Sequence, residues 1–139
     1  MITDQDLKLD GMAPLLQVFD MPRSIRFYRD VLGFEVIATN DGADGDDADW
    51  VHLRIPGAEL MLNTAYERDK RPPTPLPEFV KAHADTSLYF GCKDINRAHE
   101  KLTRSGVAHE GPLVTGYGWD AIHLLDPDGY LIYLHWPRA

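Results

Sequence analysis

Three histidines and two tyrosines lie on stretches whose alternating apolar and polar residues are typical of strands: His52, Tyr89, His123, Tyr133 and His135. Imidazole titrates near neutral pH and binds many metals. A phenol donates protons or lines pockets with its ring. Three uses therefore compete for these side chains: an unconventional metal site, acid–base chemistry on a substrate, or the lining of a ligand pocket. Pocket lining is the commonest use of such strand residues, and the sequence favours it.

The strands that carry these residues belong to a pattern that occurs twice. In each half an apolar strand leads into a helix, which begins at a capping aspartate (Asp20 or Asp94) and ends at a glycine (Gly33 or Gly106). Further strands follow each helix. The strands expected from alternation and turn residues are 14–19, 34–38, 50–55, 59–63, 87–92, 107–110, 119–125 and 131–136.

The two halves also align through their hairpins. Pro56-Gly57 and Asp126-Pro127-Asp128-Gly129 are turn signals. Aligning the two hairpins on their glycines places Met61 over Tyr133 and Asn63 over His135. A repeat of about 70 residues is too long for a solenoid unit and predicts one domain of two paired modules.

The single domain predicted for the 139 residues has module one at about 12–63, a Pro-rich crossover at 64–82 and module two at about 83–137. Four prolines between 72 and 77 exclude a central strand there, and a short helix is expected near 77–82. The acidic loop 40–49 lacks the closing glutamate of an EF-hand, which favours a solvated connection over a calcium site. A Gly-flanked segment at 116–119 is typical of a mobile flap.

The net charge of −8 argues against nucleic acid as a partner. It mildly favours cationic ligands. No apolar run is long enough to span a membrane, and the amino-terminal residues do not resemble a signal peptide. The lone Cys92 fits a reducing compartment, so we expect a cytoplasmic protein.

Three segments resemble the glyoxalase/bleomycin resistance protein/dioxygenase (vicinal-oxygen-chelate) superfamily: 18–36, 93–107 and 126–137. The resemblance implies an α+β fold in which two βαβββ modules form a cup-shaped, eight-stranded mixed sheet around the site. The metal-dependent members of the superfamily use four ligand positions. Carried over, these positions are Ala13, Met61, Ser87 and Tyr133. Their side chains are not those that divalent metals prefer, so we expect no metal and no cofactor.

Strand alternation predicts which side chains face the cup. The hairpin turns place His52 opposite Met61 and His123 opposite Tyr133. Arg54 and Glu59 are expected to form a cross-strand ion pair. The predicted ligand-binding residues are Gln17, Phe19, Trp50, His52, Met61, Asn63, Tyr89, Trp119, His123, Tyr133 and His135.

An aromatic wall with a few polar groups is typical of a small-molecule site. The resemblance to the bleomycin-resistance branch implies a homodimeric protein that sequesters an aromatic or cationic ligand, such as an antibiotic. The alternative is a glyoxalase-like lyase, isomerase or dioxygenase that uses pocket His and Tyr residues or an unconventional metal. A partner-binding module would rest only on the Pro-rich crossover. No catalytic residue is assigned.

Overall fold

The computed structural model describes residues 7–40 and 48–138. Most of the acidic loop, and with it the calcium alternative, lies outside these residues. In chain order the elements are β1 (Leu15–Val18), α1 (Met21–Ile25), the π-helical turn η1 (Arg26–Val31), β2 (Glu35–Thr39), β3 (Trp50–Ile55), β4 (Ala58–Thr64), the 3₁₀ turn η2 (Arg68–Lys70), α2 (Pro77–Lys81), β5 (Ser87–Gly91), α3 (Ile95–Arg104), β6 (Glu110–Val114), β7 (Trp119–Leu125) and β8 (Leu131–Pro137).

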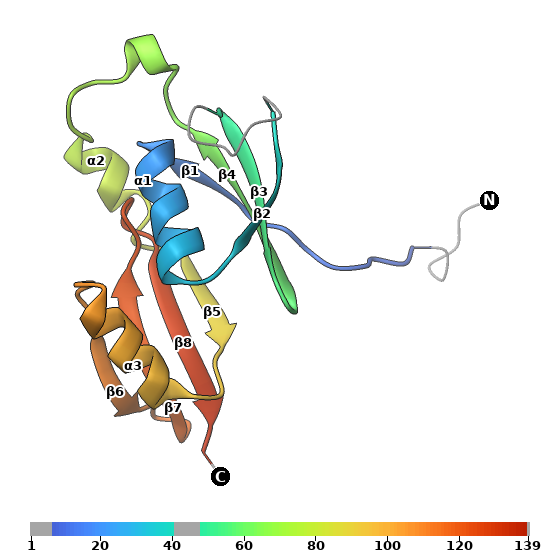
Figure 1. Cartoon of the computed structure of the whole chain (residues 1–139), viewed down its shortest axis with the longest axis vertical. Coiled ribbons are helices and arrows are strands. Elements are labelled where there is room, and N and C mark those ends of the chain that lie inside the picture. Colours follow the sequence, from blue (N-terminus) through green and yellow to red (C-terminus); the bar gives the residue numbers. More distant parts are fainter. Residues whose placement is uncertain (1–6, 41–47, 139) are drawn as a thin grey trace.

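The eight strands form two four-stranded mixed sheets with the same topology. The first has the order β1-β4-β3-β2 and the second the order β5-β8-β7-β6. In each sheet the first strand runs parallel to the fourth, and the other pairs are antiparallel. This repeated βαβββ arrangement confirms the α+β class and the duplication expected from the sequence (Figure 1).

Each sheet carries its helix on one face only. The Asp20 carboxylate caps α1 by accepting a hydrogen bond from the backbone N–H of Arg23 (3.4 Å), and Asp94 caps α3 in the same way (3.0 Å to Arg97 N). The helix expected up to Gly33 continues beyond α1 as the π-helical η1. The buried side chains of both sheets face these helices and form one core.

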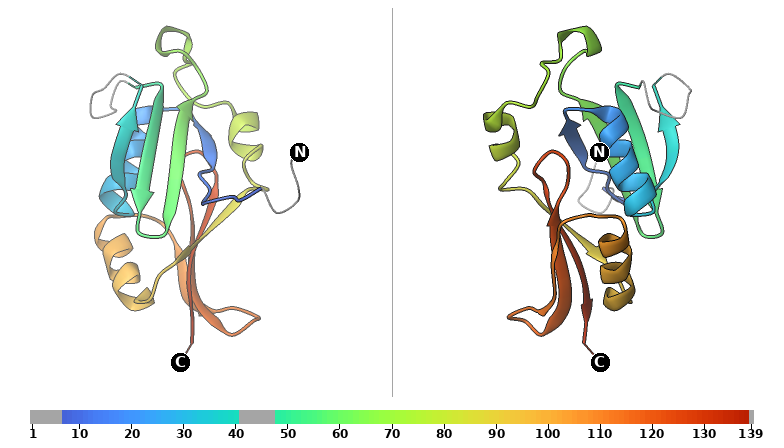
Figure 2. Two further views of the ribbon diagram at one scale, coloured as in Figure 1. Left: turned by 90° about the vertical axis from the view of Figure 1, so that its right-hand side faces the viewer. Right: turned by 60° about the vertical axis from the view of Figure 1, so that its left-hand side comes forward.

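The two halves lie one after the other along the longest axis of the molecule (Figure 2). The turn between β7 and β8 reaches into the first half. There the Asp128 carboxylate accepts hydrogen bonds from the backbone N–H of Phe19 (2.8 Å) and the hydroxyl of Ser24 (3.1 Å). Phe34 meets Phe90 edge to face, with ring centroids 5.6 Å apart. Polar contacts at one point and aromatic contacts at another therefore join the halves.

Two local predictions were wrong. The strand expected at 107–110 is β6, at Glu110–Val114, and it includes Pro112. This proline is tolerated because β6 is an edge strand that pairs only with β7. Arg54 and Glu59 are opposite in register, but Arg54 pairs with Glu35 and Glu59 with His52.

Within the described residues, no helix has both the length and the apolar character needed to cross a bilayer.

Candidate functional site

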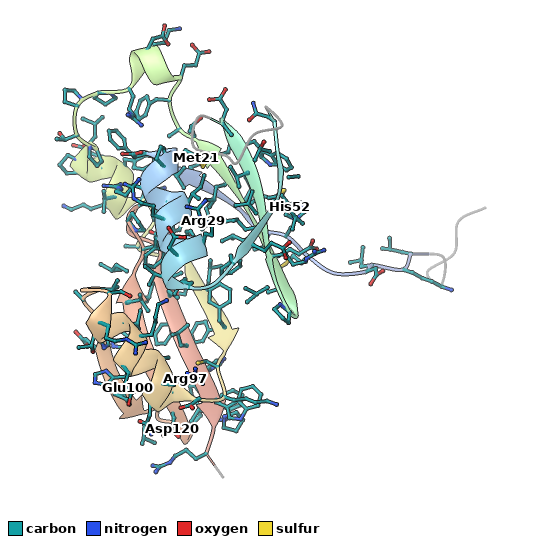
Figure 3. The ribbon with its side chains drawn as sticks, viewed as in Figure 1. Met21, Arg29, His52, Arg97, Glu100 and Asp120 are labelled. Carbon is teal, nitrogen blue, oxygen red and sulfur yellow. The ribbon has the colours of Figure 1, made fainter. Side chains whose placement is uncertain are left out.

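The candidate site is built from the face of each sheet that lies away from its helix, called here the inner face. Figure 3 shows His52 on this face of the first sheet, on the side away from Met21 and Arg29 of the helical segment. The registers His52↔Met61 and His123↔Tyr133 are those expected from the hairpin turns. The inner faces of the two halves therefore carry equivalent residues at equivalent positions.

The inner face of the second sheet is a continuous aromatic platform across β5, β8 and β7. The rings of Tyr89 and Tyr133 stack with centroids 4.4 Å apart and planes 2° from parallel. His135 meets Tyr89 at 5.2 Å and Trp119 at 4.7 Å, and His123 lies 5.4 Å from Tyr133. Desolvation raises the pKa of Tyr89, and the neighbouring Tyr133 phenol adds to the effect. This surface is therefore a continuous run of aromatic rings in mutual contact.

Tyr117 extends this platform and was not among the predicted binding residues. It lies in the turn between β6 and β7, with its ring 5.7 Å from that of Trp119 and its hydroxyl 3.4 Å from Nδ1 of His135. A backbone hydrogen bond from Gly118 to Thr115 closes the turn. Tyr117 is 59% exposed, so its ring is available at the rim of the platform. The sequence signal that could have identified Tyr117 is an aromatic residue between two glycines, next to a hairpin.

The inner face of the first sheet is more polar. Trp50 and His52 are neighbours on β3, with ring centroids 6.0 Å apart. Gln17 of β1 lies beside Asn63 of β4 in the parallel register. The next pair on the same face of these strands is Leu15 with Met61. This half thus offers amide groups, an imidazole and one indole around an apolar strip.

A glutamate accompanies one inner-face histidine in each half. Nε2 of His52 lies 3.2 Å from Oε1 of Glu59, and Nε2 of His123 lies 3.1 Å from Oε2 of Glu110. The first contact is not aligned as a hydrogen bond. These two carboxylates were not among the predicted binding residues, because Glu59 was expected to pair with Arg54 and no contact was predicted for Glu110. They give both inner faces a negative group next to an aromatic one.

Phe19 lies apart from the other predicted binding residues. It is buried just beyond the end of β1, where its ring meets Tyr66 edge to face at 6.0 Å and the Arg71 guanidinium at 5.6 Å. The structure thus brings together Gln17, Trp50, His52, Met61 and Asn63 on one inner face, and Tyr89, Trp119, His123, Tyr133 and His135 on the other.

Comparison with known families agrees with this architecture. Residues 9–134 match the model of the Glyoxalase/Bleomycin resistance protein/Dioxygenase superfamily. The chain belongs to this superfamily. No curated protein sequence matches it significantly.

Solved structures share the superfamily fold over nearly the whole chain. A bleomycin-binding protein complexed with bleomycin is 20% identical, with a TM-score of 0.67 over 94% of this chain and 100% of that one. TnmS3, an antibiotic-binding protein from a Streptomyces species, is 22% identical (TM-score 0.61; 95% and 100%). A virulence protein from Salmonella typhimurium is 24% identical (TM-score 0.66; 95% and 100%). At these identities the likeness shows the fold alone.

The divalent metal used by many members of the superfamily does not fit the residues present. Of the four corresponding positions, Met61 lies beside Leu15 and Tyr133 is stacked on Tyr89. The other two are Ala13 and Ser87, an alanine and a serine. A thioether, a methyl group, a hydroxyl and a stacked phenol form a poor donor set for Mg²⁺, Mn²⁺, Ni²⁺ or Fe²⁺. Across the described residues, no group of three or more His, Cys, Asp or Glu side chains is placed to hold a metal.

Proposed function

We propose that this protein binds a flat aromatic small molecule, with a preference for a cation such as a basic antibiotic, and holds it unchanged. The aromatic platform of Tyr89, Tyr133, His135 and Trp119 is the observation that carries the proposal. Stacking against such rings is worth about 0.5–1.5 kcal/mol per pair beyond area burial. The fold shared with a bleomycin-binding protein and with the antibiotic-binding protein TnmS3 supports the same proposal.

The preference for a cation rests on the carboxylates beside the platform and on the overall charge. Glu59 and Glu110 each stand next to an inner-face histidine. The chain carries a net charge of −8, which raises the local concentration of cations. A cation above an aromatic face gains further energy from the ring quadrupole.

The proposed binding cup is made by two copies of the chain. The halves of one chain lie end to end, and their inner faces leave Leu15 48% and Tyr89 52% exposed. An extended arm before β1 leaves the body of the molecule (Figure 1) and exposes Leu7, Leu9 and Met12 by 73%, 85% and 76%. Pairing the first half of one protomer with the second half of its partner would cover these apolar groups.

Calorimetric titration with bleomycin and with three anthracenes tests the ligand class. The anthracenes carry an aminomethyl, a hydroxymethyl or a carboxylate group on the same ring system. We expect saturable binding of bleomycin and the order ammonium, then alcohol, then carboxylate among the anthracenes. Mass spectrometry should recover each ligand unchanged. Absence of binding for all four compounds, or tighter binding of the carboxylate at the platform, would contradict the proposal.

Sedimentation equilibrium tests the two-chain cup. The wild type should have twice the mass of one chain, and the Leu9→Asp/Met12→Asp variant should shift toward the monomer and lose bleomycin affinity. A wild-type monomer that binds bleomycin tightly would overturn the two-chain arrangement while leaving the ligand class intact.

One observation favours an enzyme as the second candidate. His52 and His123 each lie within 3.2 Å of a glutamate oxygen, and a carboxylate beside an imidazole raises the basicity that a general base needs. Turnover of a bound ligand, lost in both His52→Gln and His123→Gln, would decide for a lyase, an isomerase or a dioxygenase of this superfamily.

A further inference from the structure

A cavity lies between the two halves, on the side of the molecule that carries the helices. Its volume is about 550 Å³. One wall comes from the end of η1, the segment that leads into β2 and the last residue of β3, and the other comes from β5, β8 and α3. The cavity shares no lining residue with the inner faces described above.

The floor of the cavity is apolar. It is made by side chains that the core leaves half-buried, among them Val31, Leu32 and Phe90. Phe34 and Leu134 lie beneath them as part of the buried core. A cavity of a few hundred cubic ångströms with an apolar wall is of the size and character that small ligands use.

One rim of the cavity is cationic. Arg97, Lys101 and Arg104 all line it, and their spacing of four and three residues places them on the same face of α3. Figure 3 shows Arg97 on the side of α3 nearer β5. Lys101 donates a hydrogen bond to the carbonyl of Asp30 (3.2 Å), so the η1 wall helps to hold it over the cavity.

This positive rim stands out against the chain's net charge of −8. Among the lining residues Asp94 is the acidic one, against the three cationic side chains of α3. The lining therefore carries a net positive charge next to an apolar floor. Guanidinium groups bind carboxylates through two parallel hydrogen bonds, which makes them the preferred partners of such anions.

We propose that this cavity binds an amphipathic organic anion, with an acyl or aryl body on the apolar floor and a carboxylate against Arg97, Lys101 and Arg104. The site is separate from the cup in position and opposite to it in charge preference. Its occupant is a small molecule, because positive charge on one rim of an apolar cavity of this volume matches a single anionic head group with an apolar body.

Cys92 gives the experiment a built-in reporter, because it lines the cavity and is the chain's lone cysteine. Burial raises the pKa of its thiol, so its reaction is followed at pH 8 with the uncharged reagent 4,4′-dithiodipyridine. We expect saturating decanoate to slow this reaction at least fivefold. Decanol, which has the same chain without the charge, should need at least a tenfold higher concentration for the same protection.

Charge-removing variants separate anion recognition from simple apolar filling. Arg97→Gln/Arg104→Gln should raise the decanoate concentration for half-protection about tenfold and leave that for decanol unchanged. Lys81→Gln, which removes an exposed cation from α2, is the matched control and should behave as wild type.

Three results would overturn the proposal. They are equal protection by decanol and decanoate, no protection by either, or a change of oligomeric state in the double variant, which would make this face a protein interface. The aminomethyl anthracene bound in the cup should not compete with decanoate. A failure of the cup proposal therefore leaves this test intact.

Discussion

The phenol of Tyr28 donates a 2.6 Å hydrogen bond to Oδ2 of Asp126, across the junction of the two halves. Both residues are buried. Oδ1 of the same carboxylate accepts the backbone N–H groups of Asp128 (2.8 Å) and Tyr130 (2.9 Å). Desolvation outweighs these three bonds and raises the pKa of Asp126 to about 6. The junction therefore rests on a carboxylate that is well bonded yet costly to ionise.

Replacing Tyr28 by phenylalanine removes one of these three bonds without changing the packing of the ring. Because hydrogen bonds to charged groups contribute about 1.5–3 kcal/mol, we expect Tyr28→Phe to lower the free energy of unfolding by about 2 kcal/mol at pH 7. Tyr66→Phe is the control, since Tyr66 makes ring contacts with Phe19 and Phe79. Urea unfolding measures both, and equal stabilities for the two variants would contradict the role given to Tyr28.

The raised pKa of Asp126 predicts that its contribution to stability falls as the pH rises. Between its usual value of 3.8 and about 6, the folded protein binds a proton on Asp126 that the unfolded chain has released. Burial raises the pKa of Asp128 as well, which acts in the same direction. With about 1.4 kcal/mol per pKa unit, Asp126 destabilises the fold by up to about 3 kcal/mol at pH 7 relative to a pH well below its usual pKa.

Asp126→Asn tests this pH dependence, because the amide stays neutral throughout and still has an acceptor oxygen. We expect the variant to lose less stability than the wild type between pH 4 and pH 6 in urea unfolding. The difference measures Asp126 alone, since Asp128 and the other carboxylates are present in both proteins. An unchanged slope would show that Asp126 titrates as it does in the unfolded chain.

The sequence predicted most of the fold because local physics determines most of it. Alternation and the two glycine turns correctly predicted the registers His52↔Met61 and His123↔Tyr133. The Tyr28–Asp126 bond was not predicted, since its partners are 98 positions apart and Asp-Pro-Asp-Gly signals only a turn. Local patterns carry no information about such a distant partner.

The candidate site was predicted in part for the same reason. Side chains that alternate along one strand were assigned to the inner faces, and their cross-strand neighbours followed. The contacts of His52 and His123 with glutamates were not predicted, because Glu59 was expected to pair with Arg54 and no partner strand was assigned to Glu110, which lies opposite His123. The cavity beside α3 was not expected either, since its walls come from distant parts of both halves.

The two hairpin glycines, Gly57 and Gly129, provide an internal comparison. Both have positive φ (85° and 90°), so a side chain adds backbone strain of about 1–2 kcal/mol at either. A Cβ at Gly57 meets nothing within 4 Å, whereas one at Gly129 lies 2.8 Å from both Cγ1 and the carbonyl oxygen of Val80. We expect Gly57→Ala to cost about 1 kcal/mol and Gly129→Ala about 3 kcal/mol. Equal losses in thermal or urea unfolding would contradict the close approach of α2 to this turn.

Removing a ring from the platform should weaken ligand binding, whereas removing a ring from the opposite face of the same strand should not. Tyr133→Leu deletes the ring that stacks on Tyr89 and lies 5.4 Å from His123. We expect a loss of about tenfold in affinity for bleomycin and for the aminomethyl anthracene, since an aromatic pair is worth about 0.5–1.5 kcal/mol and tenfold is about 1.4 kcal/mol. Trp136→Leu is the control. Trp136 follows on β8 but contacts Lys93 away from the platform, so calorimetry should give wild-type affinity. Equal losses of affinity in both variants would mean that the rings affect binding only by stabilising the fold. No loss of affinity in Tyr133→Leu would mean that the ligand binds elsewhere.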